Sequence, residues 1–396
     1  MSMENKIMEL ARKYEQYVID QRRWVHQHAE LAWQEHETTA HIEEELRAMG
    51  IEPQKFDGLT GCWAMIRGGK ADENSRTILL RADIDALETV EATSHNFQSL
   101  NKGVMHACGH DSHVAMLLGA AKILTEIRDE LEGNVKLFFQ GAEEIANGAM
   151  YYVNQGVCEG TDATLAVHIT SWGKTGTYSI PDGPQTASSD QFTVTVHGKA
   201  CHGGMPHEGH DAITCMAAIV MNLQPLVSRE NDCRNASVIT IGRVDAGYQY
   251  NVVASKAEIH GNVRDYDPVH RMEVAKRIEE VCKYTALAYG CTADVDYEFK
   301  TGPVVHTNIA FNDLVRNAAA KHFGQESLLK AKPVTGSDDV AYLIEKVPGV
   351  FAFVGAANEA KGCCYPHHHE CFDVDEDAFI RGTVLLAQSS YDFCKK

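Results

Sequence analysis

Residues 105–113 bring a thiol and several imidazoles together within nine positions. Cys108 and His110 are separated by one glycine, so in an extended or turning backbone both side chains leave the chain on the same side. One cation can then bind both, and thiolate with imidazole is a donor pair that suits zinc and related transition metals. Asp111 and Ser112 are typical of a helix start and precede an apolar run. The sequence therefore predicts a cation site where a loop meets a helix.

Acidic and imidazole side chains recur where other apolar runs end. The run 135–139 reads as a strand and leads to Glu143 and Glu144, of which one could bind a metal while the other faces a water molecule. A Glu-Glu pair is usually a solvated surface feature, but its place just after an apolar strand weakens that interpretation. Three more side chains lie at similar strand ends, each with an ordinary structural role as the alternative: Asp83, Asp85 and His168.

Cys108 also has alternative interpretations, since a lone cysteine is usually a buried apolar residue and a thiol near histidine can be a nucleophile. A thiol packed among imidazoles and close to acids suits a cation better. Ser337 lacks the Gly-x-Ser-x-Gly elbow of a serine nucleophile. The Gly-rich stretch 199–207 carries two imidazoles and is either a flexible hairpin end or part of a site. Residue chemistry alone does not decide which of the three histidines 367–369 could bind a metal.

The overall composition limits the class of protein. With 55 acidic and 36 basic residues the net charge is −19, which opposes nucleic acids and anionic membrane surfaces because both need a positive footprint. No run of 18 apolar residues occurs, and residues 1–17 are polar, unlike a signal peptide. The twelve cysteines are scattered without a Cys-x-x-Cys pair. We therefore expect a cytoplasmic protein with mostly reduced cysteines that binds neither nucleic acid nor membrane.

The 396 residues are enough for two domains. Helical spacing over residues 4–49 is followed by alternating strand-like and helical runs, a pattern typical of an α/β sheet that places its sites at the carboxyl ends of strands. From near Gly183 the order becomes strand, helix, strand, strand, helix, strand, which predicts a ferredoxin-like α+β insert over residues 185–299. Residues 1–184 and 300–396 then form one discontinuous domain that carries the candidate ligands.

Several motifs together resemble a known family. They are Arg-Ala-Asp-Ile-Asp-Ala-Leu at 81–87, residues 105–113, Gly-Ala-Glu-Glu at 141–144, His-Gly-Gly-Met-Pro at 202–206, Ser-Asp-Asp at 337–339 and the stretch 368–376. Taken in order, they resemble the dinuclear metallo-amidohydrolases, which include aminoacylases, hippurate hydrolases and auxin-amino acid conjugate hydrolases. The resemblance covers nearly the whole chain. It implies a mixed-sheet catalytic domain of the zinc-exopeptidase type, with the ferredoxin-like insert as a dimerisation or lid domain.

The resemblance also implies a metal-ligand set. His368 is selected from the histidine triplet because the family places its last ligand four residues before a phenylalanine, here Phe372. Asp85 matches an acid that orients the ligands and tunes their basicity. The implied ligands of two divalent cations are Cys108, His110, Glu144, His168 and His368. Zinc or manganese is expected at these positions, with nickel or cobalt as alternatives.

The remaining matches imply catalytic and substrate-binding roles. Glu143 is the general base, and His202 polarises the scissile carbonyl, in relatives from the partner subunit. Asn251 and Arg264 match positions that hold the substrate's carboxylate or oxyanion. Three departures from the family pattern remove neither a ligand nor the base and bear on substrate preference: Glu88 and Ala254 in place of proline, and Asp338 in place of glutamate.

The implied activity is hydrolysis of the amide bond of N-acyl amino acids by a water molecule that bridges the two cations, in a homodimer or a tetramer. A dipeptidase or carboxypeptidase with the same site is the alternative among metal-dependent enzymes. Two hypotheses from other classes stay open as well. One is a metal-binding or ligand-binding protein without catalysis, and the other is a cysteine hydrolase that uses Cys108.

Overall fold

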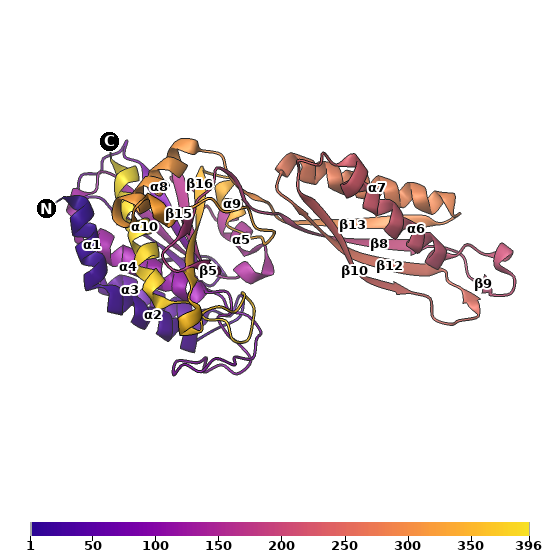
Figure 1. Ribbon diagram of the computed structural model, residues 1–396, viewed down its shortest axis with the longest axis horizontal. Coiled ribbons are helices and arrows are strands. Elements are labelled where there is room, and N and C mark those ends of the chain that lie inside the picture. The colour runs from indigo at the N-terminus through magenta and orange to yellow at the C-terminus, as the bar shows by residue number, and fades with distance from the viewer. Residues whose placement is uncertain (1, 396) are drawn as a thin grey trace. The chain divides into compact units, whose positions relative to one another are not determined.

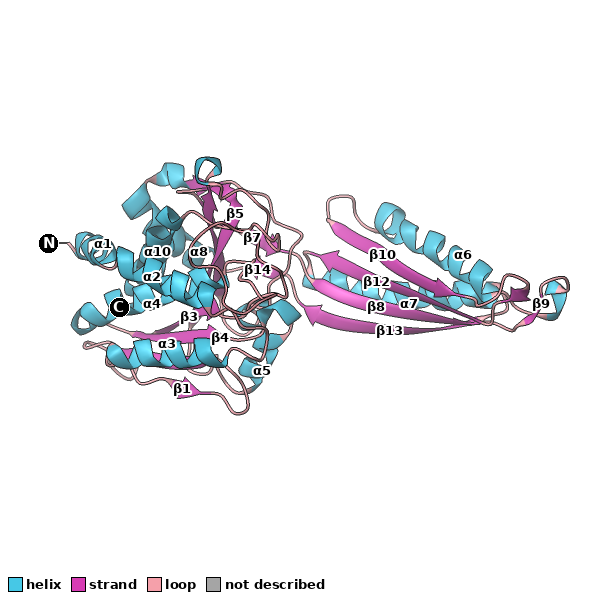
Figure 2. Ribbon diagram, turned by 90° about the horizontal axis from the view of Figure 1, so that it is seen from below, coloured by secondary structure: helices cyan, strands magenta, loops and turns pink. Residues whose placement is uncertain are grey.

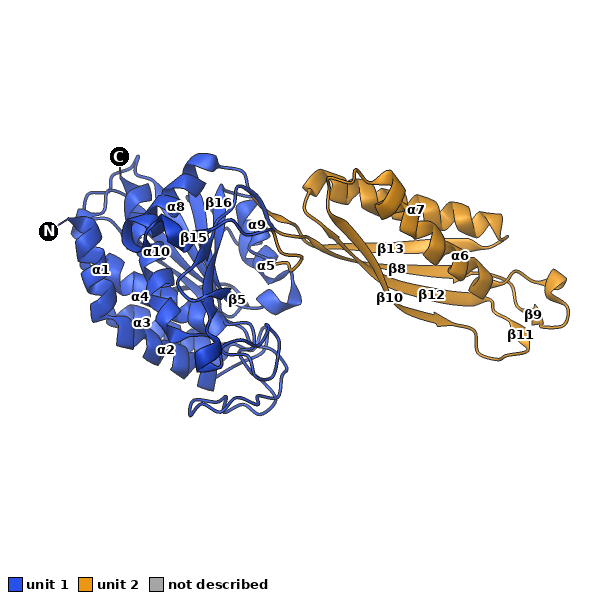
Figure 3. Cartoon of the chain, in the orientation of Figure 1, with its two compact units in different colours: residues 1–185, 306–332, 339–396 blue, residues 186–305, 333–338 orange. Residues whose placement is uncertain are grey.

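The structure is a computed structural model and describes residues 2–395 (Figure 1), with helices and strands in both halves of the chain (Figure 2). The chain divides into two compact units (Figure 3). Unit 1 comprises Met1–Gln185, His306–Lys332 and Asp339–Lys396, and unit 2 comprises Thr186–Val305 and Pro333–Asp338. The chain passes between the units within β7 (Gly183–Thr186) and β14 (Val304–His306), and again at 332/333 and 338/339. The sequence placed the first two boundaries at 184/185 and 299/300.

A mixed sheet forms the centre of unit 1. Within the described residues it has eight strands in the order β1-β2-β4-β3-β5-β16-β6-β15. The central neighbours β4/β3, β3/β5 and β5/β16 are parallel, whereas β2/β4 and β16/β6 are antiparallel. The strand bounds are Gln54–Lys55 (β1), Cys62–Arg67 (β2), Thr77–Asp83 (β3), Asn134–Gln140 (β4), Ala163–Lys174 (β5), Tyr178–Ser179 (β6), Leu328–Leu329 (β15) and Gly349–Ala357 (β16).

Helices pack on this sheet and bury its central strands. Every residue of β3 is buried, as expected for a parallel strand that is covered on both faces. α4 is apolar on nearly all sides and contacts β3, β5, α2 and α10, so its N-terminus is held firmly at the sheet edge. The helices of unit 1 are Met3–Lys13 (α1), Glu15–Gln27 (α2), His36–Ala48 (α3), His110–Glu126 (α4), Gly148–Asn154 (α5), Ile309–Phe323 (α8), Ala341–Ile344 (α9) and Phe379–Cys394 (α10).

Unit 2 has the ferredoxin-like order that the sequence predicts. Its main strands and helices alternate as strand, helix, strand, strand, helix, strand, and the sheet order is β10-β12-β8-β13 with antiparallel neighbours. Two short strands, β9 and β11, pair as a separate ribbon. The bounds are Ser189–His197 (β8), Cys201–His202 (β9), Ala212–Pro225 (α6), Ser237–Ala246 (β10), Val252–Val253 (β11), Lys256–Asp265 (β12), Pro268–Ala288 (α7) and Thr292–Thr301 (β13).

The segment Ala212–Glu230, which contains α6, is long and apolar enough to cross a membrane by length and composition alone. Its buried side chains include Cys215, Ile219 and Leu223, which recur at helical spacing and belong to the core of unit 2. One face of α6 therefore belongs to the core of unit 2, and 28% of the apolar segment is buried.

Two local predictions near the candidate ligands are wrong. The helix expected to start at Asp111 or Ser112 starts at His110, because Gly109 takes a left-handed conformation with φ 94° and caps it. The sequence was interpreted with Glu143 and Glu144 as neighbours on an extended backbone, but they lie in a 3-10 turn, Glu143–Ile145. Both changes place a candidate ligand at the beginning of a helical turn.

Candidate metal centre

The candidate ligands lie close together at the carboxyl ends of the parallel strands of the unit 1 sheet. In the β3/β4 register Asp83 is level with Gln140, so the segments that carry Asp85 and Glu143 leave the sheet side by side. β5 is parallel to β3 with Ala166 opposite Arg81, which brings His168 to the same level. This convergence is the reason why ligands from distant parts of the chain can meet.

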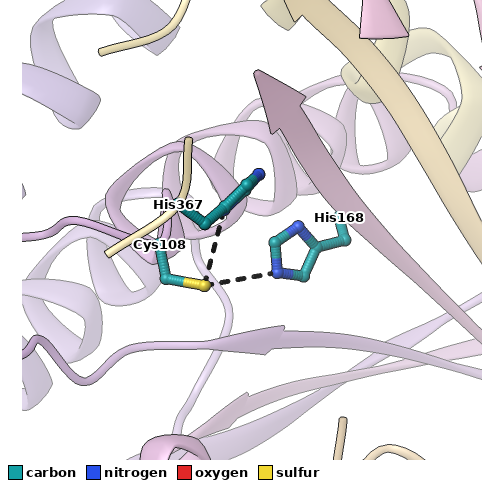
Figure 4. A group of neighbouring side chains, drawn as sticks. All are labelled: Cys108, His168 and His367. Atoms are coloured by element: carbon teal, nitrogen blue, oxygen red, sulfur yellow. Dashed lines mark hydrogen bonds between the residues drawn. The ribbon is translucent and has the colours of Figure 1, made fainter. Parts of the chain in front are cut away.

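Cys108 lies between two imidazoles. Its Sγ is 3.7 Å from Nε2 of His168 and 3.7 Å from Nδ1 of His367 (Figure 4). A Cβ on Gly109 would lie 2.4 Å from a methyl carbon of Ile169, so only glycine allows the chain to pass here. Burial raises the pKa of the Cys108 thiol well above its usual value, which disfavours a free thiolate nucleophile at neutral pH.

A second ligand group shares Cys108 and contains His110 and Glu144, with all three ligand atoms within 4.8 Å of one another. Nδ1 of His110 donates to the Asp85 carbonyl oxygen at 2.9 Å, so Nε2 is the ring nitrogen that can bind a cation. Within residues 2–395, neither this Nε2 nor Oε1 of Glu144, 3.7 Å away, has a hydrogen-bond partner although both are buried. Burial raises the pKa of Glu144 to about 7. Thiol, imidazole and carboxylate with unsatisfied buried atoms fit a divalent cation.

His168 has its proton on the side away from Cys108. Its Nδ1 donates to the Ile169 carbonyl at 2.6 Å, which leaves the Nε2 lone pair directed at the sulfur. Behind it, His113 accepts the Ile169 N–H on Nε2 at 2.8 Å and donates from Nδ1 to Asp83 at 2.5 Å. His113 therefore supports the backbone at His168 and is not itself free to bind a cation.

Asp85 fixes the turn that presents both glutamates. Its Oδ1 accepts the N–H of Glu143 at 3.0 Å and its Oδ2 accepts the N–H of Glu144 at 2.9 Å. The turn is flanked by Ala142 and Ala146, with φ of 61° and 62°. Left-handed alanines are strained and persist only where the surroundings determine them. The sequence assigned Asp85 an orienting role, and the structure gives it these two contacts.

Glu143 is oriented by a second network. Its Oε1 accepts the N–H of Asp339 at 3.3 Å, and its Oε2 lies 3.9 Å from Nε2 of His110. The Asp339 carboxylate accepts from Arg81 at 2.9 Å and from Gln140 at 2.7 Å. The carboxylate of Glu143 is thus held next to the ligand group with one oxygen engaged by the backbone.

Glu35 also supports the turn and is not a candidate from the sequence. Its Oε1 accepts the N–H of Ala142 at 2.8 Å, and its Oε2 accepts the Thr60 hydroxyl at 2.6 Å. Burial, and then the charge of Asp85, raise the pKa of Glu35 to about 7. It lies more than a hundred residues from the turn in sequence, and no motif marks it.

The histidine triplet contributes two side chains to the site. Nε2 of His368 lies 3.6 Å from Oε2 of Glu144, and its backbone N–H donates to the Ala107 carbonyl at 2.7 Å. His368 has φ 67°, an uncommon conformation for histidine. The sequence selected His368 alone, but His367 is the imidazole beside Cys108. Its Nε2 accepts the Ser171 N–H at 3.4 Å, which puts the proton of the neutral ring on Nδ1, facing the sulfur.

The remaining candidates lie in unit 2. His202 in β9 is exposed, and Val252 of β11 pairs with it while Gly203 donates to the Asn251 carbonyl at 2.8 Å. The ribbon therefore brings His202 and Asn251 together. Arg264 lies near the far end of β12, about 26 Å along the strand from Lys256. Its Nη1 donates to Oγ of Ser337 at 3.0 Å, and burial lowers its pKa.

Known proteins resemble this chain over its whole length. It is 34% identical to "Thermostable carboxypeptidase 2" of Saccharolobus solfataricus, with 100% of both chains covered, and 36% identical to "N-acetyl-L-cysteine deacetylase" of Bacillus subtilis over 95% of this chain and 88% of that one. The crystal structure of a Bacillus subtilis protein described as a dinuclear metal binding peptidase from M20 family superposes with a TM-score of 0.84 at 33% identity, covering 96% of this chain and 98% of that one. The model of peptidase family M20/M25/M40 matches residues 79–391. The chain therefore belongs to peptidase family M20/M25/M40.

Proposed function

We propose that the protein is a metal-dependent amidohydrolase that cleaves the amide bond of N-acyl amino acids. One observation carries the proposal: two unsatisfied buried ligand atoms, on His110 and Glu144, lie beside the held carboxylate of Glu143. Family membership and the N-acetyl-L-cysteine deacetylase relative support the reaction type and the substrate class. The residues proposed to hold two divalent cations are Cys108, His110, Glu144, His168 and His368.

Glu143 acts as the general base in this proposal. When bound, the cations supply Lewis acidity that polarises the amide carbonyl and lowers the pKa of water from 15.7 to about 7. Glu143 takes the proton of the attacking water on Oε2, while the Asp339 N–H holds Oε1. The same carboxyl group then passes the proton to the leaving amine nitrogen. Such proton transfer by a positioned side chain contributes typically about 10²–10⁴-fold in rate.

His202 supplies the oxyanion contact. Its Nδ1 accepts the Gly204 N–H at 3.0 Å, so the neutral imidazole carries its proton on Nε2 and can donate it in a hydrogen bond. A donor of this type contributes roughly 3–4 kcal/mol when it is aimed at the developing oxyanion. Arg264 provides positive charge for the substrate's carboxylate in an otherwise acidic protein, and Asn251 is a further polar contact.

The protein acts as a homodimer in which His202 comes from the partner subunit. The supporting observation is the length of β12, which separates the ribbon of His202 from Arg264 within one copy of unit 2. Mixing His202→Ala with Glu143→Gln subunits tests this arrangement, because a mixed dimer has one complete site. Random reassembly should restore about one quarter of wild-type activity. No recovery, together with a monomer in light scattering, would show that His202 acts within its own chain.

Zinc is the proposed native metal because the donors include one thiolate and three imidazoles, a set softer than manganese prefers. A substrate panel of acetyl, benzoyl, indolyl and long-chain acyl amino acids, assayed with added zinc and with manganese, tests the reaction. We expect turnover that a chelator abolishes and that alkylation of surface thiols does not. Activity that survives chelation would instead support the cysteine hydrolase.

A second function is favoured by one observation. The carboxypeptidase relative matches the entire chain at 34% identity. A carboxypeptidase uses the same cations, base and carboxylate-binding arginine on a peptide instead of an acyl group. Dipeptides and N-blocked peptides in the same panel separate the two functions by their ratios of kcat/KM.

A further inference from the structure

A second group of metal-binding side chains lies in unit 1, outside the candidate metal centre. His26 on α2 and two residues of the loop 88–104, Glu91 and His95, bring three ligand atoms within 4.8 Å of one another. Their side chains are 0%, 7% and 13% exposed. None of them takes part in the proposed hydrolysis, so their close approach calls for another explanation.

Both distances from Glu91 in this group match the separation of two ligand atoms on one metal ion. Oε1 of Glu91 lies 3.3 Å from Nε2 of His26 and 3.4 Å from Nε2 of His95. A tetrahedral ion with bonds of about 2.0–2.1 Å to nitrogen and oxygen separates its ligand atoms by roughly 3.3–3.4 Å. A charge-assisted hydrogen bond between the same atoms is shorter, about 2.7–2.9 Å.

The proton positions support the same conclusion. Nδ1 of His26 lies 2.7 Å from Oδ2 of Asp111 and donates to it, so Nε2, which faces Oε1 of Glu91 at 3.3 Å, is the nitrogen that the ring offers to a cation once it is deprotonated there. Among the residues that the structure describes, neither ring nitrogen of His95 has a hydrogen-bond partner. A carboxylate behind a histidine is also the arrangement that orients metal-binding imidazoles. A cation between the three groups satisfies all of them at once.

The local charge admits a cation even though Arg22 is close. Nε of Arg22 lies 2.9 Å from Asp111, and its Nη2 lies 2.8 Å from Asp373. Glu376, 3.5 Å from Nη1, is a third carboxylate on the same guanidinium. These partners take up the arginine charge. Glu91 accepts the Ser99 N–H on Oε2 at 2.7 Å and the Thr93 hydroxyl on Oε1, which holds the carboxylate with Oε1 between the two imidazoles and leaves a second lone pair of Oε1 for a cation.

We propose that His26, Glu91 and His95 form a third divalent metal site, distinct from the dinuclear centre. Two imidazoles and one carboxylate suit Zn²⁺, with a fourth position taken by water. The ion ties the loop 88–104 to α2 just before the chain enters residues 105–113. Its role is to hold this loop in place.

Zinc analysis of the full-length protein tests the proposal. His95→Phe removes a ligand but keeps an aromatic ring on Phe97, against which His95 stacks with ring centroids 3.8 Å apart. Glu91→Gln is a second variant in case the first does not fold, and His36→Phe at an exposed position is the matched control. After dialysis against Zn²⁺, we expect three ions per chain in wild type and control, and two in His95→Phe and Glu91→Gln.

A Cys108→Ser background separates this site from the dinuclear centre. Cys108→Ser alone should keep one zinc ion per chain, at the third site. The double variant Cys108→Ser/His95→Phe should keep none. Two ions in the wild type, or equal zinc contents in wild type, His95→Phe and Glu91→Gln, would overturn the proposal. The zinc count does not depend on any substrate, so failure of this proposal and failure of the proposed hydrolysis are told apart.

Discussion

Replacing Glu35 tests whether a buried carboxyl group sets the turn that carries Glu143. Glu35 accepts from the Ala142 N–H and the Thr60 hydroxyl, and burial with the nearby charge of Asp85 raises its pKa to about 7. Glu35→Gln keeps an acceptor for Ala142 and removes the ionisable group. Glu35→Leu removes both acceptors and leaves two buried donors unsatisfied.

The pH dependence has a definite sign. A carboxyl group whose pKa is raised from 4.5 to about 7 contributes stability that is complete below pH 4.5 and is lost as the pH rises through 7. In the metal-free protein this ionisation lowers the free energy of unfolding by about 1 kcal/mol at pH 5.5 and about 3 kcal/mol at pH 8.5. The stability of Glu35→Gln relative to wild type should therefore rise by about 2 kcal/mol between these pH values. Glu35→Leu should lose about 2–6 kcal/mol at pH 5.5.

Urea unfolding followed by tryptophan fluorescence measures these differences, because every tryptophan of the chain lies in unit 1: Trp24, Trp33, Trp63 and Trp172. The measurement is made with chelator present, so that no cation shifts the titration. Glu9→Gln, at an exposed position of α1, is the control and should match wild type at both pH values. A difference between Glu35→Gln and wild type that does not change with pH would refute the raised pKa.

Three substitutions at the candidate centre have distinct expected outcomes. Glu143→Gln should keep its zinc by metal analysis and lose about 10²–10⁴-fold in kcat, whereas near wild-type turnover would exclude it as the base. Cys108→Ser should lower the zinc content of the centre, and unchanged content would remove the thiol from the ligand set. Asp85→Asn cannot accept both N–H groups of the 143–145 turn, so zinc affinity, measured by chelator competition, should fall about 10–100-fold. Unchanged affinity would assign Asp85 to folding alone.

The larger elements were predictable because their periodicity is strong. The buried runs that became β3, β4 and β5 and the strand and helix order of unit 2 could be read from the sequence. The two-residue strands Gln54–Lys55, Tyr178–Ser179 and Leu328–Leu329 could not, because two residues carry no alternation. Their pairing is decided by neighbours that come from elsewhere in the chain.

The site was predictable where motif residues and strand ends coincide, as they do at Cys108 and Glu144. The conformation of the turn at Glu143 was not predictable, because its left-handed residues are alanines. Only glycine or asparagine at such positions indicates that conformation in a sequence. His367 was not predicted for a different reason. Which of the three consecutive histidines contacts Cys108 depends on the left-handed backbone conformation at His368, and the residue types do not reveal that conformation.

The helical spacing of residues 4–49 predicts only an outer layer of helices, but these helices also support the candidate metal centre. Glu35, just before α3, accepts the N–H of Ala142, and Arg22 on α2 binds Asp111, the neighbour of His110. Glu35 holds the backbone of the turn and Arg22 holds the side chain of the residue that follows His110, so neither contacts a ligand directly. Since buried groups without partners are costly, removing either side chain would leave its partner unsatisfied, and the nearby ligand would lose its orientation. The geometry of the centre therefore depends on residues 22–35, which carry no ligand of the dinuclear pair but reach it through one buried guanidinium and one buried carboxyl group.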